Sequence, residues 1–156
     1  MNKALGILFI CLLLISETTI AQQATRRILT QEDAKNLIAA AEERAAQDEW
    51  NVVIVIVDAG GHLLGLTRMD NVQLSSIEIA IQKAKAAAFY RRPTKVFQDR
   101  HAGGETGVLA LPGVMPFEGG VPIEYDGRII GAIGVSGVTA AQDGMIANAA
   151  LESFNR

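Results

Sequence analysis

The sequence contains few cysteine, histidine or aromatic residues, and each shortage excludes a class of site. Among 156 residues there are one cysteine, two histidines, one tryptophan and 5% aromatic side chains in total. A single thiol excludes disulfides within the chain, and Cys11 lies in the N-terminal apolar run, so we expect no thiolate chemistry in the mature protein. Two histidines without thiols are too few for a closed structural zinc site.

The remaining composition is that of a soluble globular protein. Apolar residues make up 49% of the chain and charged residues 20%, values that argue against intrinsic disorder. The net charge of −3 lacks the basic excess that drives nucleic-acid binding, so no nucleic-acid partner is expected. The length leaves room for one compact domain, and no internal repeat indicates a second.

The first 21 residues have the pattern of an export signal. A positive start at Lys3 precedes an apolar run over residues 4–15, and residues 19–21 resemble the small-x-Ala pattern cut by signal peptidase. As a helix this run reaches roughly 18 Å, too short for the ~30 Å hydrocarbon core of a membrane. We therefore predict a cleaved signal peptide over residues 1–21 and a periplasmic or secreted protein without a membrane anchor. An uncleaved anchor is the alternative.

The mature chain begins with a predicted flexible lead-in over residues 22–29, followed by a single domain over residues 30–156. Thr30 caps a predicted helix that extends to about Asp48. The β-branched run at residues 52–57 predicts a strand covered on both faces, and a turn joins it to a second strand at 62–69.

The second half of the chain continues with a helix, a glycine-rich loop, a hairpin and a last helix. The expected elements are a helix over 75–91, a short strand at 108–111, strands at 122–125 and 128–136, and a helix from Thr139 to about Phe154. Asp126-Gly127 is a favoured two-residue hairpin turn. Two hairpins indicate an antiparallel sheet, so the fold class is α+β with helices packed on the sheet.

Glycines at positions 131, 134 and 137 do not form a nucleotide-binding motif. They lie three residues apart within a strand, whereas a dinucleotide site needs G-x-G-x-x-G in a strand-to-helix turn. Small residues there instead let a helix or a partner chain approach the sheet. Ser136 does not stand in a G-x-S-x-G motif and has no recognisable triad context, which argues against serine hydrolysis.

Three charged side chains are candidates for binding an anionic ligand or for ordinary surface roles. Arg68 ends a strand, where Asp70 can hold its guanidinium for a carboxylate, or the two form only a surface ion pair. Lys83 lies at the border of a helix face, either with its amine in solvent or as a point charge in a pocket.

A loop and two histidines complete the candidates. The sequence Glu118-Gly119-Gly120 can bring backbone amides close to a ligand, or it can simply make a tight bend. His101 lies in a flexible segment where an imidazole can reach an iron or a proton. His62 follows a hairpin turn and is either a cofactor ligand or an exposed turn residue.

Six ordered blocks of sequence resemble the GlcG/HbpS-like haem-binding family, which is related to the C-terminal domain of PduO-type proteins. The blocks are Asp58-Ala59-Gly60-Gly61-His62-Leu63, Arg68-Met69-Asp70, Lys83-Ala84-Lys85-Ala86, Arg92-Pro93-Thr94, Gly119-Gly120-Val121-Pro122-Ile123 and the segment 131–137 followed by Asp143. The similarity covers roughly residues 30–154. It implies a profilin-like fold, a five-stranded antiparallel sheet with helices on both faces, assembling as homo-oligomers, with haem as cofactor in some members.

Three functions follow as hypotheses. The first is an exported binding protein for haem or a related tetrapyrrole, with Arg68 or Lys83 meeting the propionates and a histidine meeting the iron. The second is an enzyme or accessory factor for a small organic acid. In it, Arg68 and Lys83 hold the carboxylate of the acid, and Glu118, Asp143 or His101 moves a proton. The third is a scaffold that self-associates through the strand at 131–137. A binding protein without catalysis is favoured over an enzyme.

Overall fold

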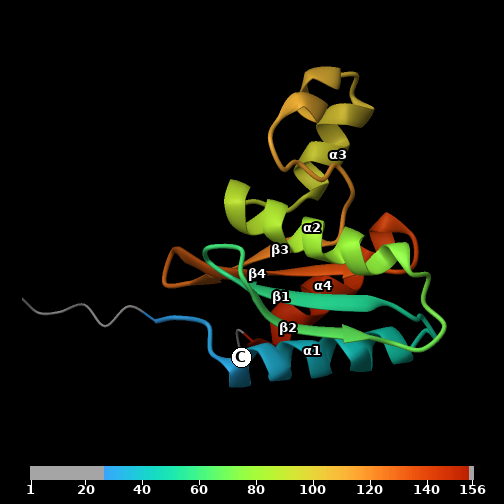
Figure 1. Cartoon of the computed structure of the whole chain (residues 1–156), viewed down its shortest axis with the longest axis vertical. Coiled ribbons are helices and arrows are strands. Elements are labelled where there is room, and N and C mark those ends of the chain that lie inside the picture. Colours follow the sequence, from blue (N-terminus) through green and yellow to red (C-terminus); the bar gives the residue numbers. More distant parts are fainter. Residues whose placement is uncertain (1–26, 155–156) are drawn as a thin grey trace, which may run out of the picture.

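A computed structural model describes residues 27–154, which form four α-helices and a four-stranded antiparallel sheet (Figure 1). The elements in chain order are α1 (Gln31–Ala46), β1 (Val53–Asp58), β2 (Leu63–Arg68), α2 (Ser75–Tyr90), α3 (Lys95–Ala102), the 3₁₀ helix η1 (Thr106–Ala110), β3 (Gly120–Tyr125), β4 (Arg128–Ser136) and α4 (Ala140–Phe154). The predicted signal peptide lies outside the described residues. Among those residues no helix combines the length and the hydropathy of a membrane span.

Strand β1 is the centre of the fold, as its uninterrupted β-branched run predicts. The sheet order is β2-β1-β4-β3, and helices cover both faces. Val53, Val55 and Val57 pack towards α2 on one face. Ile54 and Ile56 belong to the core shared with α1 and α4 on the other face. The prediction of an antiparallel α+β fold with helices on both faces is confirmed.

The glycine at position 134 lets α2 lie directly on the sheet. A Cβ added at Gly134 would overlap the carbonyl oxygen of Ala80 and come within 2.6 Å of the backbone nitrogen of Ala84. The prediction that small residues admit a helix is therefore confirmed. Because β4 lies between β1 and β3 and is largely buried, this strand cannot form the subunit contact that the scaffold hypothesis required.

The predicted caps and the tight turn are present. Thr30 accepts a hydrogen bond from the backbone N–H of Asp33, whose carboxylate accepts one from the backbone N–H of Thr30. Thr139 and Gln142 form the same reciprocal pair at α4. Asp126 and Gly127 have φ values of 50° and 70°, both positive as a type I′ turn requires.

The expectation of five strands is wrong for the described residues, because the segment expected as a strand at 108–111 is mostly the 3₁₀ helix η1. Its backbone donors are used locally: the N–H of Val108 bonds to Glu105 and that of Leu111 bonds back to Val108. Val108 is its one buried side chain. A segment that buries a single side chain has no alternating apolar face to place on a sheet.

The segment between α2 and β3 contains α3 and η1 and projects from the sheet and its covering helices (gold, at the top of Figure 1). We call this segment the excursion. Hydrogen bonds tie its base to the neighbouring elements. The Tyr90 hydroxyl at the end of α2 donates to the Pro112 carbonyl at 2.6 Å, and the backbone N–H of Thr94 donates to the Gly120 carbonyl in β3 at 2.9 Å. The first of these bonds fixes the position of the wall that Pro112 contributes to the groove described below.

Candidate functional site

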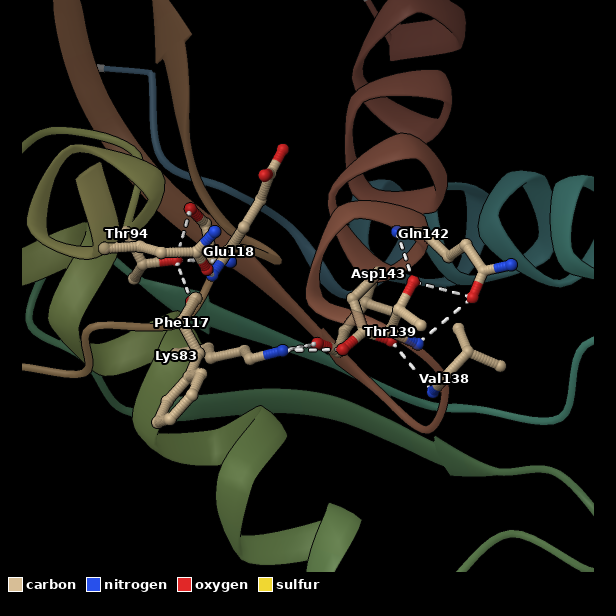
Figure 2. Close-up of polar contacts among 11 residues, drawn as sticks. Lys83, Thr94, Phe117, Glu118, Val138, Thr139, Gln142 and Asp143 are labelled. Atoms are coloured by element: carbon tan, nitrogen blue, oxygen red, sulfur yellow. Dashed lines mark hydrogen bonds and ion pairs between the residues drawn. The ribbon is translucent and has the colours of Figure 1, made fainter. Parts of the chain in front are cut away.

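Lys83 and Asp143 form a buried ion pair at the start of β3 (Figure 2). The Lys83 Nζ lies 2.7 Å from Asp143 Oδ2 and donates a second hydrogen bond to the Val135 carbonyl at 2.9 Å. The two side chains are 2% and 3% exposed. Lys83 is thus shielded from solvent, and two of the three N–H donors of its amine are used within the protein.

The pair joins helices on opposite faces of the sheet, and Gly119 leaves the space for it. Lys83 belongs to α2 and Asp143 to α4. A Cβ at Gly119 would lie 2.9 Å from the Lys83 Nζ and 2.8 Å from the Asp143 Cβ. Gly119 also has φ +123°, a conformation that favours glycine. Helical spacing in the sequence does not show that the Lys83 side chain reaches Asp143 on the other face of the sheet. The spacing therefore predicts only a position at the border of a helix face.

Burial shifts both groups towards their neutral forms. Loss of solvation lowers the pKa of Lys83 and raises the pKa of Asp143, and each effect is opposed by the charge of the partner. The backbone N–H of Val138 donates a further hydrogen bond to Asp143 at 3.2 Å. A compensated buried pair of this kind orients the elements that carry it and leaves no free charge for a ligand.

The Glu118-Gly119-Gly120 segment makes a tight bend whose amides are partly used inside the protein. The N–H of Glu118 donates to Gln98 Oε1 at 2.7 Å, and the N–H of Gly120 donates to the Thr94 hydroxyl oxygen at 2.9 Å. The Glu118 side chain packs against Gly144. Binding of a ligand by these residues stays a prediction, and the geometry favours a structural bend.

Arg68 and Asp70 lie away from the Lys83 pair. Both are exposed, and no hydrogen bond or ion pair joins either side chain to another described residue. Arg68 ends β2, at the sheet edge opposite β3. Three strand spacings, roughly 14 Å, separate it from the β3 edge that Lys83 reaches. The structure therefore does not bring Arg68 and Lys83 together around one ligand.

A groove of about 780 Å³ opens between the β1–β2 turn and the C-terminal half of α2. Its lining combines the turn, one side of α2 and the end of the excursion: Ala59, Gly60, Gly61, His62, Gln82, Lys85, Ala88, Phe89, Arg91, Pro112 and Gly113. Lys85 and Arg91 supply positive charge, and no carboxylate is among these lining residues. Phe89, 72% exposed, offers an uncovered aromatic surface. The groove thus suits an anionic ligand with an apolar body.

His62 stands at this groove and is oriented by Asp58. Asp58 Oδ1 accepts hydrogen bonds from the backbone N–H groups of Gly60 and His62 at 2.8 and 2.9 Å. Asp58 Oδ2 lies 3.3 Å from His62 Nδ1. Partial burial alone would raise the pKa of Asp58, but the hydrogen bonds from His62 and Gly60 outweigh it and lower that pKa. The carboxylate therefore stays ionised beside the imidazole at neutral pH.

His101, the other candidate ligand, lies elsewhere. It is exposed in the last turn of α3 and does not line the groove. Sequence reasoning missed Lys85, Phe89 and Arg91, because nothing in their spacing distinguishes them from ordinary solvent-facing positions on a helix. The Asp58–His62 contact had a local signal, since an aspartate before a Gly-Gly turn commonly accepts the turn's N–H groups.

Comparisons with known proteins agree with this fold over nearly the whole described chain. The family described as "haem degrading protein HbpS-like" matches residues 29–152. GlcG of Escherichia coli K12 is 45% identical over 112 residues, covering 72% of this chain and 84% of GlcG. A PduOC:heme complex has a TM-score of 0.76 at 34% identity, covering 83% of this chain and 96% of that one.

A double mutant of HbpS from Streptomyces reticuli is also similar in structure. Its TM-score is 0.77 at 28% identity, and the match covers 87% of this chain and 93% of that one. The match to the family extends over far more than half of the sequence, and the identity to GlcG holds across most of both proteins. The resemblance noted from the six sequence blocks is confirmed. The chain belongs to the HbpS-like family.

Proposed function

We propose that this protein binds haem or a related tetrapyrrole in the groove beside the β1–β2 turn. The observation that carries the proposal is the lining itself, which combines two cations, an uncovered phenylalanine and an imidazole around one hollow of about 780 Å³. The similarity to a protein solved in complex with heme supports the choice of ligand class.

The chemistry of the groove fits a tetrapyrrole. Ligand sites are typically hollows of about 300–1,000 Å³ with mostly apolar walls and a few polar groups that fix orientation. Phe89 and Pro112 can pack on a flat macrocycle, while Lys85 and Arg91 can pair with its carboxylates. When bound, haem would supply an iron centre with open coordination positions. The chain itself would contribute orientation, charge neutralisation and an imidazole.

The second hypothesis, action on a small organic acid, receives less support. It relied on Arg68 and Lys83 holding one carboxylate, but these residues lie at opposite edges of the sheet and Lys83 is paired with Asp143. The proposal also includes export with cleavage before Gln22, supported by the apolar N-terminal run. N-terminal sequencing of the protein recovered outside the cytoplasm tests that step.

The experiment is a titration of the purified protein with hemin, followed by the Soret absorbance. We expect a saturable red shift, weakened at least tenfold in the Lys85→Ala/Arg91→Ala double variant. Lys35→Ala/Arg128→Ala is the matched control, because it removes the same charge from exposed residues outside the groove. Absence of a saturable shift in the unaltered protein contradicts the proposal, as does equal weakening in both double variants.

A further inference from the structure

We infer that the Asp58–His62 turn is a preformed iron-ligating device, in which His62 Nε2 is the ligand and Asp58 and Gly60 are positioning residues. The inference rests on the proposed function and goes beyond it by assigning the contact between protein and iron. Three observations carry it: the hydrogen bonds of Asp58, the space beside Gly60, and the place of His62 on the groove wall.

The contact with Asp58 selects the His62 tautomer that carries its proton on Nδ1 and leaves Nε2 free to bind a metal. An ionised carboxylate only accepts hydrogen bonds, so the His62 Nδ1 at 3.3 Å carries the proton and Nε2 keeps its lone pair. A histidine that binds metal through one nitrogen commonly donates its other N–H to a carboxylate, which fixes the ring and raises its basicity. The contact that His62 makes with Asp58 is of this kind.

Gly60 leaves the space in which the imidazole folds back over the turn. A Cβ added there would lie 2.9 Å from both Cε1 and Nδ1 of the His62 ring and 3.2 Å from Asp58 Oδ1. Any larger residue at this position would therefore displace the ring from its carboxylate. The pair of ring and carboxylate depends on the absence of a side chain at residue 60.

The position of His62 makes its free nitrogen available to a ligand in the groove. Its side chain is 83% exposed and lines the groove together with Lys85 and Phe89. The only other histidine of the chain, His101, does not line this groove. The protein thus offers one imidazole to the iron, and we expect a single-histidine complex.

The test compares hemin complexes of the full protein and its variants by absorbance and by resonance Raman spectroscopy of the reduced form. We expect an iron–histidine stretching band in the unaltered protein that disappears in His62→Ala and returns, as an iron–imidazole band, when free imidazole is added. Hemin affinity should fall at least tenfold in His62→Ala. His101→Ala, an exposed histidine outside the groove, is the matched control and should leave band and affinity unchanged.

Two further variants separate positioning from folding. Asp58→Asn keeps one oxygen to accept the backbone N–H groups but loses the carboxylate that faces Nδ1, so the band should move to lower frequency and affinity should fall about 10–100-fold. Gly60→Ala should give a similar loss. Circular dichroism melting, expected to be unchanged in His62→Ala because that side chain is exposed, verifies the fold.

The outcomes distinguish this inference from the proposed function. If the unaltered protein binds hemin saturably and His62→Ala retains both its spectrum and its affinity, the inference is overturned while haem binding stands. A shift of the stretching band in His101→Ala instead of His62→Ala also overturns it. If the unaltered protein binds no hemin, the proposed function fails first and the inference fails with it.

Discussion

Among the ion pairs of the described residues, Lys83–Asp143 is the one with both side chains buried, and its role is structural. Two opposite charges lie 2.7 Å apart with almost no contact with solvent. Taking both out of water costs several kcal/mol per ion, which their attraction and hydrogen bonds offset only when both partners are present. Removing one partner leaves an uncompensated buried charge, so the effect of one substitution should depend strongly on the other.

This dependence is testable with a double-mutant cycle. We expect Lys83→Met to lower the free energy of unfolding by about 3–5 kcal/mol, because Asp143 is left buried and unpaired. Lys83→Met/Asp143→Leu should recover most of that loss, since no buried charge remains. Urea denaturation of the four proteins measures the coupling. Strictly additive losses would show that the two charges do not depend on each other.

Asp33 at the start of α1 provides a pH-dependent contribution to stability. The N–H of Thr30 is the main cause that lowers the pKa of Asp33 below its ordinary 3.8, while partial burial opposes the shift. A group with a lowered folded-state pKa stabilises the protein above its unfolded pKa, and this stabilisation is lost as pH falls through the folded value.

We therefore expect Asp33→Asn to reduce stability by about 1 kcal/mol at neutral pH, as loss of a helix cap does. The difference from the unaltered protein should be constant above about pH 5, where the carboxylate is ionised in both states. It should shrink steadily below pH 4. Urea denaturation at a series of pH values measures it, and a difference that grows towards low pH would contradict the assignment.

At the scale of elements, the excursion between α2 and β3 matters because its end forms part of the groove. Pro112 and Gly113 line the groove, and the Tyr90 hydroxyl holds the Pro112 carbonyl at 2.6 Å. The Tyr90 ring also packs edge-on against Phe97, with centroids 4.9 Å apart. The hydroxyl and the ring therefore have separable roles, one for the groove wall and one for packing.

Tyr90→Phe removes only the hydroxyl and tests the role of that hydrogen bond. We expect hemin affinity to fall a few-fold and amide exchange over residues 106–113 to accelerate, with little change in the melting temperature because the ring contact is kept. Tyr125→Phe is the control, since it removes a hydroxyl that lies outside the groove. Unchanged affinity and exchange in Tyr90→Phe would mean that the excursion is held in place without this bond.

Sequence reasoning succeeded for elements whose signals are local. Caps at Thr30 and Thr139, the Asp126-Gly127 turn and the β-branched run of β1 are all read from a few adjacent residues, and the structure has each of them. The same reasoning was wrong for the segment 108–111. Its apolar residues predict a strand, whereas its backbone forms local 3₁₀ hydrogen bonds.

At the scale of the whole molecule, the candidate site could be predicted only in part. His62 is a candidate from its turn alone, but the groove beside it depends on where the C-terminal half of α2 lies relative to the β1–β2 turn. A Cβ at Gly61 would lie only 3.7 Å from Lys85 Cγ, a contact between residues far apart in the sequence. Lys83 shows the same limit, because its partner lies 60 residues away on the opposite face of the sheet.

Lys83 and Lys85, two residues apart on α2, therefore have different roles. Lys83 points to the sheet edge and stabilises the fold, whereas Lys85 lines the groove beside the turn. Their separation along α2 lets the protein keep one charge buried and paired while the other lies at the groove.

The location of the bound ligand tests the account most directly. Hemin contains paramagnetic iron, so in ¹H–¹⁵N correlation spectra it broadens the amide signals nearest to it. We predict that broadening during a titration centres on residues 59–62, 85–91 and 112–113, which surround the groove. Broadening centred on Arg68 or His101, or spectra that hemin leaves unchanged, would contradict the account.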